Sequence, residues 1–482
     1  MTFPSHAYDP AAKRWVLALT SVGSLMAVLD AMAVAATLGT IRTDLGASLE
    51  ALEWTMNAYN LSFAVLLLAG AALGDRFGRR RMFVAGLAVF VAASAACALS
   101  TSAAALIVAR AVQGAGAALI MPLAMTLLSA AFPPQERGKA LGLFSSITGL
   151  GLIAGPVLGG AIAAAGSWPW IFWINIPLGV VLIPLARARL PESFGAATAV
   201  DAPGVALVTG SAFAVVWALM RGNEAGWAGA EVLTACALAA LFAIAFVVWE
   251  RRAAQPMIPM RFFGARGFSS GIAACFLFCA GMYGVVFLLP QFLQLAQGRD
   301  ALGAGLRLLP WTAMLFVFAP LGGVLVNRLG ERRITVAGLV VQALGQAWIA
   351  RVASPDVAYA TLVPALVLAG AGVSLAMPAA QNAVFNAVAR ADAGKASGVY
   401  NMARFLGGMA GIAIAAAVFQ AQGGFASPAA FSDGFGAAMT VSAILSLAAA
   451  AAGLWLPAQR RTPAATEERT GVEKVPAPEF GA

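Results

Sequence analysis

The sequence has few charged residues. Asp, Glu, Lys and Arg make up only 11% of its 482 residues, whereas a soluble domain carries about 25%. Apolar residues reach 61%, above the roughly 45–50% of soluble domains. This composition excludes an ordinary water-soluble enzyme. It also argues against a nucleic-acid partner, although the net charge is +9.

Histidine and cysteine are also scarce. The one histidine, His6, lies in the polar N-terminal tail, which excludes a histidine relay for protons. The four cysteines fall inside apolar stretches without a histidine nearby, at Cys97, Cys236, Cys275 and Cys279. We therefore expect no metal site, no disulfide and no bound cofactor.

Long apolar stretches, in contrast, are abundant. Each is about 20 residues long, enough to cross a hydrocarbon core of about 30 Å. Charges or Gly and Pro clusters separate them. The stretches predict an all-α, polytopic membrane protein with fourteen spans, at residues 15–40, 54–74, 82–99, 104–131, 141–165, 170–185, 204–220, 232–249, 268–290, 304–326, 334–350, 359–383, 397–420 and 435–456. The first stretch lacks a signal-peptide cleavage pattern and is expected to remain as a span.

The basic residues are distributed unevenly between the gaps. Of the thirty Lys and Arg, 23 lie in alternate gaps and in the two tails, and four lie in the other gaps. Cytoplasmic loops of membrane proteins carry the excess of Lys and Arg. We therefore expect a multi-pass protein of the plasma membrane with both termini in the cytoplasm.

An internal repeat relates the two ends of the chain. Residues 110–122 align with residues 366–378, and glycine, methionine and proline positions match. A duplicated six-helix unit is typical of transporters whose two bundles rock about a site at the membrane midplane. The spans are therefore expected in a 6+2+6 arrangement of two pseudo-symmetric six-helix bundles. The expected divisions are an N-terminal bundle (1–190), two inserted helices with linkers (191–266), a C-terminal bundle (267–458) and a disordered tail (459–482).

The segment at 73–81, between spans two and three, reads LGDRFGRRR. Topology alone explains its arginines, but it explains Asp75 less well. An acid one turn before an arginine cluster can bind the basic loop in one conformation and release it in another. Asp75, Arg76, Gly78 and Arg79 are therefore candidates for a cytoplasmic gate.

Span five carries a glycine pattern. Gly151, Gly155 and Gly159 are each four residues apart, so they form a stripe without side chains along one helix face. Such a stripe allows close contact between helix backbones, and simple helix packing is the plainer interpretation. Pro156 removes one helical hydrogen bond. The complete motif consists of Gly142, Gly151, Gly155, Pro156, Gly159 and Gly160.

With these motifs the chain resembles the major facilitator superfamily, and within it the fourteen-span drug:proton antiporters. The segment at 73–81 is similar to the family's first cytoplasmic-loop motif. Arg110, Gln113 and Gly114 match its fourth-span motif, and the span-five glycines match a motif associated with antiporters. Residues 168–179 are similar to the family's WRWiFxxNxPxG segment, with Pro169 in place of an arginine. In span one, Leu29-Asp30 matches the branch, whereas the Thr, Asn and Pro expected after it are absent.

Asp30 is the one acidic residue expected near the middle of a span. It lies about 22 Å beyond Trp15 along a helix, and a charge there costs several kcal/mol unless it is protonated or paired. We therefore predict that Asp30 couples protons to transport, with Arg110 as a candidate partner. For both Asp30 and Arg110, the alternative is a purely structural role.

Few other polar side chains lie within the spans, which favours large lipophilic ligands over sugars. Arg404 replaces Thr148 of the repeat and either meets substrate or pairs with backbone carbonyls. Interhelical packing is the alternative for each of these residues. The candidate substrate pocket comprises Tyr59, Gln113, Met121, Tyr283, Asn401 and Arg404.

These features predict efflux of lipophilic or cationic toxic compounds, driven by the proton gradient and requiring no cofactor. The expected partners are the substrate, protons and membrane lipids. A first alternative is a metabolite exporter, for amino acids or sugars, on the same scaffold. A second is an intramembrane enzyme or sensor, but no mid-span nucleophile and base occur together and no output domain is present.

Overall fold

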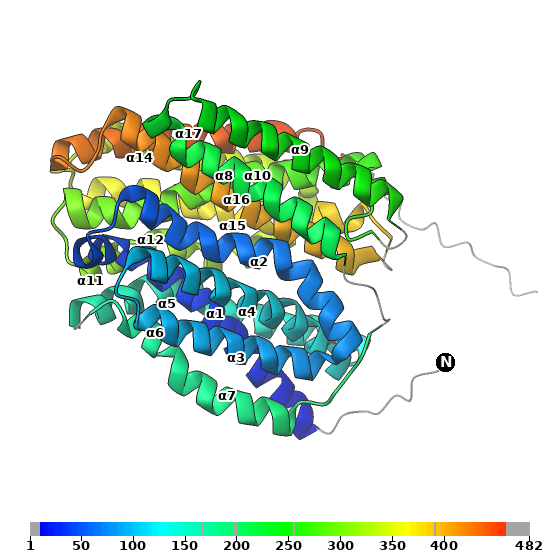
Figure 1. Ribbon diagram of the computed structural model, residues 1–482. Coiled ribbons are helices and arrows are strands. Elements are labelled where there is room, and N and C mark those ends of the chain that lie inside the picture. The colour runs from blue at the N-terminus through cyan, green and yellow to red at the C-terminus, as the bar shows by residue number, and fades with distance from the viewer. Residues whose placement is uncertain (1–9, 166, 196–200, 254–255, 390–391, 459–482) are drawn as a thin grey trace, which may run out of the picture.

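The computed structural model describes residues 10–165, 167–195, 201–253, 256–389 and 392–458. In these ranges every regular element is helical, and fourteen helical segments are long and apolar enough to cross a membrane. The helices run side by side in one bundle (Figure 1). The prediction of an all-α protein with fourteen spans is confirmed.

The first half of the chain forms α1 (Pro10–Leu45), α2 (Leu49–Phe77), α3 (Arg79–Ala98), α4 (Ala103–Ala131), α5 (Pro134–Ala165), α6 (Trp170–Trp173) and α7 (Asn175–Arg189). The middle forms α8 (Ala202–Ala225) and α9 (Ala230–Arg252). The rest forms η1 (Met260–Gly264), α10 (Arg266–Gln291), η2 (Phe292–Ala296), α11 (Ala301–Arg307), α12 (Leu309–Thr312), α13 (Met314–Leu329), α14 (Glu331–Val352), α15 (Tyr359–Asn386), α16 (Ala393–Gln422) and α17 (Pro428–Gly453).

Two spans that the sequence suggested as single helices are interrupted. The stretch at 304–326 falls on α11, α12 and α13, with a break at Leu308. Pro310 follows this break in the first turn of α12. It has no N–H to donate to the preceding turn, so the helix does not continue unbroken. The stretch at 170–185 is likewise divided into α6 and α7. The division falls at Ile174, shortly before Pro177.

Helix packing is alike in the two halves of the chain. In the first half α1 packs on α5 and α3 packs on α4; in the second half α10 packs on α16 and α14 packs on α15. These pairs correspond to one another under the internal repeat. The proposed boundaries at residues 190, 266 and 458 stay predictions, and the tail at 459–482 lies outside the described residues.

The two halves meet where α2 packs on α16, α5 on α11 and α1 on α10. At the first contact, the ring centroids of Phe63 and Phe405 are 4.3 Å apart. Next to the third, the side-chain amide of Gln294 in η2, the segment that follows α10, donates a hydrogen bond to the carbonyl of Ala36 in α1 at 2.6 Å. The middle helix α8 contacts both α2 and α16, so it lies beside the line where the halves meet.

Candidate functional site

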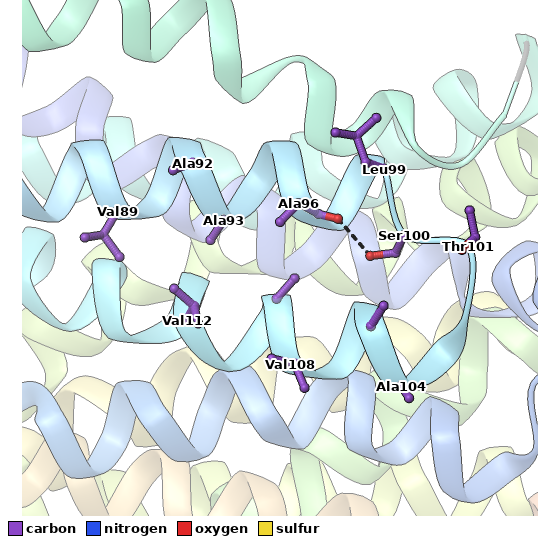
Figure 2. Close-up of a pocket in the computed structure, with 12 residues that line it drawn as sticks. Val89, Ala92, Ala93, Ala96, Leu99, Ser100, Thr101, Ala104, Val108 and Val112 are labelled. Atoms are coloured by element: carbon purple, nitrogen blue, oxygen red, sulfur yellow. Dashed lines mark hydrogen bonds between the residues drawn. The ribbon is translucent and has the colours of Figure 1, made fainter.

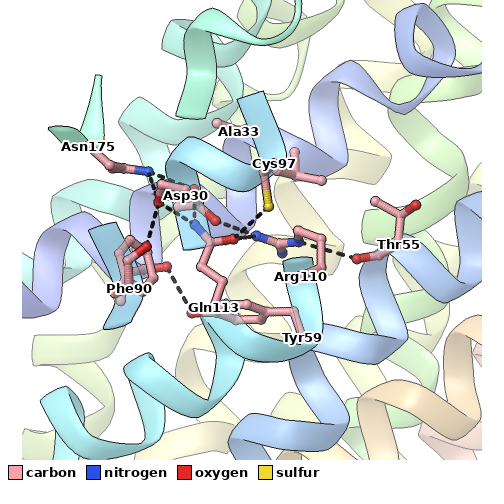
Figure 3. A network of polar contacts seen from close by, with 12 residues as sticks. Asp30, Ala33, Thr55, Tyr59, Phe90, Cys97, Arg110, Gln113 and Asn175 are labelled. Atoms are coloured by element: carbon pink, nitrogen blue, oxygen red, sulfur yellow. Dashed lines mark hydrogen bonds and ion pairs between the residues drawn. The ribbon is translucent and has the colours of Figure 1, made fainter. Parts of the chain in front are cut away.

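Asp30 lies on α1 and is 1% exposed, so its carboxylate is buried among α1, α3, α4 and α7 (Figure 3). Its Oδ2 atom is 2.5 Å from Nη1 of Arg110. Its Oδ1 atom accepts hydrogen bonds from the amides of Gln113 at 2.9 Å and Asn175 at 2.8 Å. The carboxylate is therefore both neutralised and fully surrounded by donors, as a buried charge requires.

Arg110 lies on α4 and is likewise 1% exposed. Besides Asp30, its guanidinium donates to the amide oxygen of Gln113 at 2.6 Å and to the carbonyl of Thr55 at 3.3 Å. The guanidinium carbon lies 4.3 Å from the ring centroid of Tyr59, a distance typical of a cation–π contact. The structure thus brings together the acid and the base that the sequence singled out in different spans.

Two further residues of this network were not among the sequence candidates. Ser94 of α3 accepts hydrogen bonds from the amides of Gln113 at 2.8 Å and Asn175 at 3.2 Å. Its own hydroxyl donates to the carbonyl of Phe90 at 2.9 Å (Figure 3). Asn175 had appeared only within the resemblance to the family, and Ser94 gave no signal, because a lone serine in a span is usually satisfied by its own helix.

This arrangement can respond to a single proton. Removing one partner from a buried ion pair typically costs about 3–5 kcal/mol, because the other charge is left uncompensated. Protonating Asp30 cancels its charge in the same way, so that the attraction between α1 and α4 at Arg110 is lost. Protonation of Asp30 would therefore weaken the attraction between α1 and α4.

The segment between α2 and α3 forms a second charged network. Asp75 accepts from Nε of Arg79 at 2.9 Å, and Gly78 has a φ of 106°, a conformation that favours glycine. Glu192, beyond α7, accepts from the backbone N–H of Arg80 at 2.9 Å. Glu192 was missed because it lies far away in the sequence. Of the predicted gate residues, Arg76 is exposed and its guanidinium lies over its neighbour, Phe77.

The glycine stripe of α5 lies against α1, the helix that carries Asp30. A Cβ atom on Gly155 would meet Met32, and one on Gly159 would lie 2.7 Å from the carbonyl oxygen of Ala33. The other two glycines lie elsewhere. Gly160 faces the backbone of α11 at Ala301, whereas a Cβ atom on Gly142 would have no neighbouring atom within 4 Å. The close contact therefore involves the stripe from 151 to 159.

The carbonyl of Pro156 lies close to Gly305 of α11. α5 continues through this proline from Pro134 to Ala165. Pro156 thus belongs to the contact between α5 and α11, where the two halves of the chain meet.

The six residues of the predicted substrate pocket lie in different surroundings, and their role stays a prediction. Gln113 is fully buried in the Asp30 network, where its side chain is hydrogen-bonded to Asp30, Ser94 and Arg110. Tyr59 and Tyr283 are buried, and the Tyr59 hydroxyl donates to the carbonyl of Ala27 at 3.3 Å. Asn401 is bonded to its own helix, since its amide donates to the carbonyl of Ser397 at 2.9 Å.

The remaining two candidates, Met121 and Arg404, are partly buried. Met121 packs against the apolar core of the first half. The guanidinium of Arg404 lies 4.9 Å from the centroid of the Phe405 ring.

A large hollow of about 810 Å³ lies elsewhere, between α3 and α4 (Figure 2). Apart from Ser100 and Thr101 at one end, apolar side chains line it. Leu99, Val108 and Val112 on its rim are exposed. Exposed apolar groups on a membrane helix face lipid, so this hollow offers little that could orient a substrate. In the described ranges, no group of three His, Cys, Asp or Glu residues could hold a metal ion.

Comparison with known proteins gives consistent matches. A family model described as the Major Facilitator Superfamily matches residues 20–412 and, in an overlapping match, residues 271–481. The chain is 33% identical over 421 residues to the tetracenomycin C resistance and export protein of Streptomyces glaucescens, covering 85% of this chain and 77% of that protein. It is 35% identical over 455 residues to a cephamycin export protein of Amycolatopsis lactamdurans, covering 92% and 93%.

Among solved structures, a D-xylose-proton symporter aligns with a TM-score of 0.67 and 16% identity, covering 92% of this chain and 98% of that one. A bacterial homologue of the human lysosomal transporter Spinster also aligns with a TM-score of 0.67, covering 93% and 97% of the two chains at 16% identity. These similarities establish the fold.

Proposed function

Because the chain belongs to the major facilitator superfamily, we propose that it exports lipophilic toxic compounds across the plasma membrane in exchange for protons. Membership confirms the resemblance found in the sequence, including its drug:proton antiporter branch. It also makes the chain a multi-pass membrane transporter of small molecules rather than an enzyme. Two relatives, an exporter of tetracenomycin C and an exporter of cephamycin, support export as the direction of transport.

The observation that carries proton coupling is the buried ion pair between Asp30 and Arg110. An ionisable group within the membrane is a functional candidate, because keeping it there is costly. In the proposed cycle, Asp30 takes a proton while the site faces outward. It releases the proton when the site faces the cytoplasm and the pair with Arg110 forms again.

The contact between α1 and α5 gives a route from this proton to the rest of the molecule. α5 packs on α1 next to Asp30 and on α11 in the other half of the chain. A shift of α1 therefore changes the packing between the two halves, as alternating access requires. An exchange cycle that moves one net charge across the membrane also gains about 2.3 kcal/mol per 100 mV of membrane potential. In the proposed cycle the proton gradient and this potential supply the energy, so the cycle uses no cofactor.

A growth screen tests the proposed export. The chain is expressed in a host without its own drug pumps and challenged with a panel of lipophilic toxic compounds. We expect higher tolerance of several compounds and lower cell-associated compound, both abolished by a protonophore. If no compound is tolerated better while the protein is present in the membrane, or if efflux of an amino acid or sugar rises instead, the proposal is wrong.

A further inference from the structure

Arg404 is a charge within α16, and among the described residues no opposite charge lies beside it. In the described ranges its guanidinium forms no ion pair with an acidic side chain and no hydrogen bond to a backbone carbonyl. The ionisable side chains that interact with it are Tyr283, Tyr400, Cys275 and Cys279. These four are uncharged at neutral pH in their ordinary state. A cation in the membrane interior is normally paired with an acid or with backbone carbonyls. In the described part of the chain, the neighbours of this guanidinium are instead the phenol of Tyr283 and the ring of Phe405.

The buried charge of Asp30 differs in this respect. Asp30 is already neutralised by Arg110 at 2.5 Å, so its carboxylate is engaged and does not offer a site for a cationic compound in this conformation. The side chain of Arg404 is partly accessible, whereas its neighbours Tyr283 and Tyr400 are buried. Of these two charges, the one that can receive a ligand is therefore the positive one.

A row of aromatic rings extends from Arg404 across the interface between the halves. The guanidinium carbon is 4.9 Å from the centroid of the Phe405 ring, and that ring is 4.3 Å from Phe63 of α2. The Phe63 ring stacks with Tyr59 at 6.3 Å, and Arg110 lies over Tyr59 at 4.3 Å. The cation thus stands at one end of a row of buried aromatic rings, to which both halves contribute.

We infer that Arg404 binds the carboxylate of an amphiphilic aromatic substrate, whose apolar part lies against Phe405 and Phe63. A guanidinium matches a carboxylate with two parallel hydrogen bonds, and aromatic rings favour a flat apolar group beside them. This inference rests on the proposed export function. It narrows the substrate class from lipophilic or cationic compounds to lipophilic organic acids.

The test compares two probes that differ only in charge, 1-pyrenebutyrate and the neutral 1-pyrenebutanol. Binding is measured with the full-length chain in lipid nanodiscs at neutral pH. We expect the wild-type chain to bind the carboxylate about tenfold or more tightly than the alcohol, the usual range for a charged hydrogen bond. Arg404→Gln should reduce this preference to about twofold or less, and Arg404→Lys should retain part of it.

Arg307→Gln serves as the matched control, because Arg307 is also a partly buried arginine, at the end of α11 and over Tyr359. It should keep the wild-type preference. An unchanged preference in Arg404→Gln would overturn the inference. So would a wild-type chain that does not prefer the carboxylate, a measurement that requires no variant to fold.

Efflux of ethidium from the pump-deficient host separates this inference from the proposed function. Export of ethidium without a preference for 1-pyrenebutyrate would overturn the acidic substrate class and leave export intact. A preference for the carboxylate without export of any compound in the growth screen would overturn the export function and leave the binding site intact.

Discussion

Adding one methyl group to the α5 stripe at Gly159 should disturb the contact with α1. A Cβ atom there would lie 2.7 Å from the carbonyl oxygen of Ala33 and 2.8 Å from its Cα, whereas ordinary contacts are 3.4–4 Å. Both neighbouring atoms are backbone, so no side chain can rotate away. The helices must separate by about 0.7 Å or the backbone must bend, and overpacking of this kind typically costs about 1–3 kcal/mol.

Gly142→Ala is the matched control in the same helix. No atom lies within 4 Å of a Cβ at Gly142, and alanine is favoured over glycine in a helix by about 0.5–1 kcal/mol. Chemical denaturation in detergent should therefore show Gly159→Ala destabilised by about 1–3 kcal/mol and Gly142→Ala unchanged or stabilised. The initial efflux rate should fall only in Gly159→Ala. Equal stability and equal efflux in the two variants would refute the proposed contact.

Three other predictions follow from the charged networks and the topology. Asp30→Asn and Arg110→Gln should each lower the free energy of unfolding by about 3–5 kcal/mol, and the double variant should lose less than their sum, as a double-mutant cycle would show. Glu192→Gln should cost about 1 kcal/mol in the same denaturation assay, because its partly exposed ion pairs are screened by water. In a cysteine-free background, Ala228→Cys should react with an impermeant thiol reagent in intact cells, whereas Ala389→Cys should react only after permeabilisation.

A specific result would contradict each of these three predictions. Strictly additive losses would mean that Asp30 and Arg110 do not interact, and an unchanged Glu192 variant would mean that its ion pairs contribute nothing. Labelling of Ala389→Cys but not Ala228→Cys in intact cells would reverse the proposed orientation.

The sequence allowed the spans and the charged residues to be predicted because both depend on local composition. Asp30 and Arg110 were conspicuous as charges within apolar stretches. Their contact depends on how α1 packs beside α4, which local composition does not determine. Ser94 was missed because a buried serine is common, and Glu192 because its partner Arg80 lies 112 residues away.

The glycine motif also shows that local sequence does not determine which helices pack together. Its spacing correctly indicated a smooth helix face, but only the structure shows which helix lies against it. Gly159 contacts α1, Gly160 contacts α11, and Gly142 contacts neither. Likewise, hydropathy located the span at 304–326 without indicating the breaks at Leu308 and Ala313, because apolar composition is the same in a continuous and a broken helix.

The central claim is that Asp30 couples a proton to export. It is tested most directly in proteoliposomes with an imposed pH gradient, loaded with the best compound from the growth screen. The wild-type chain should accumulate the compound against its concentration gradient. Asp30→Asn, combined with Arg110→Gln to keep the pair neutral, should allow only equilibration. Accumulation by this double variant equal to that of the wild-type chain would contradict the claim.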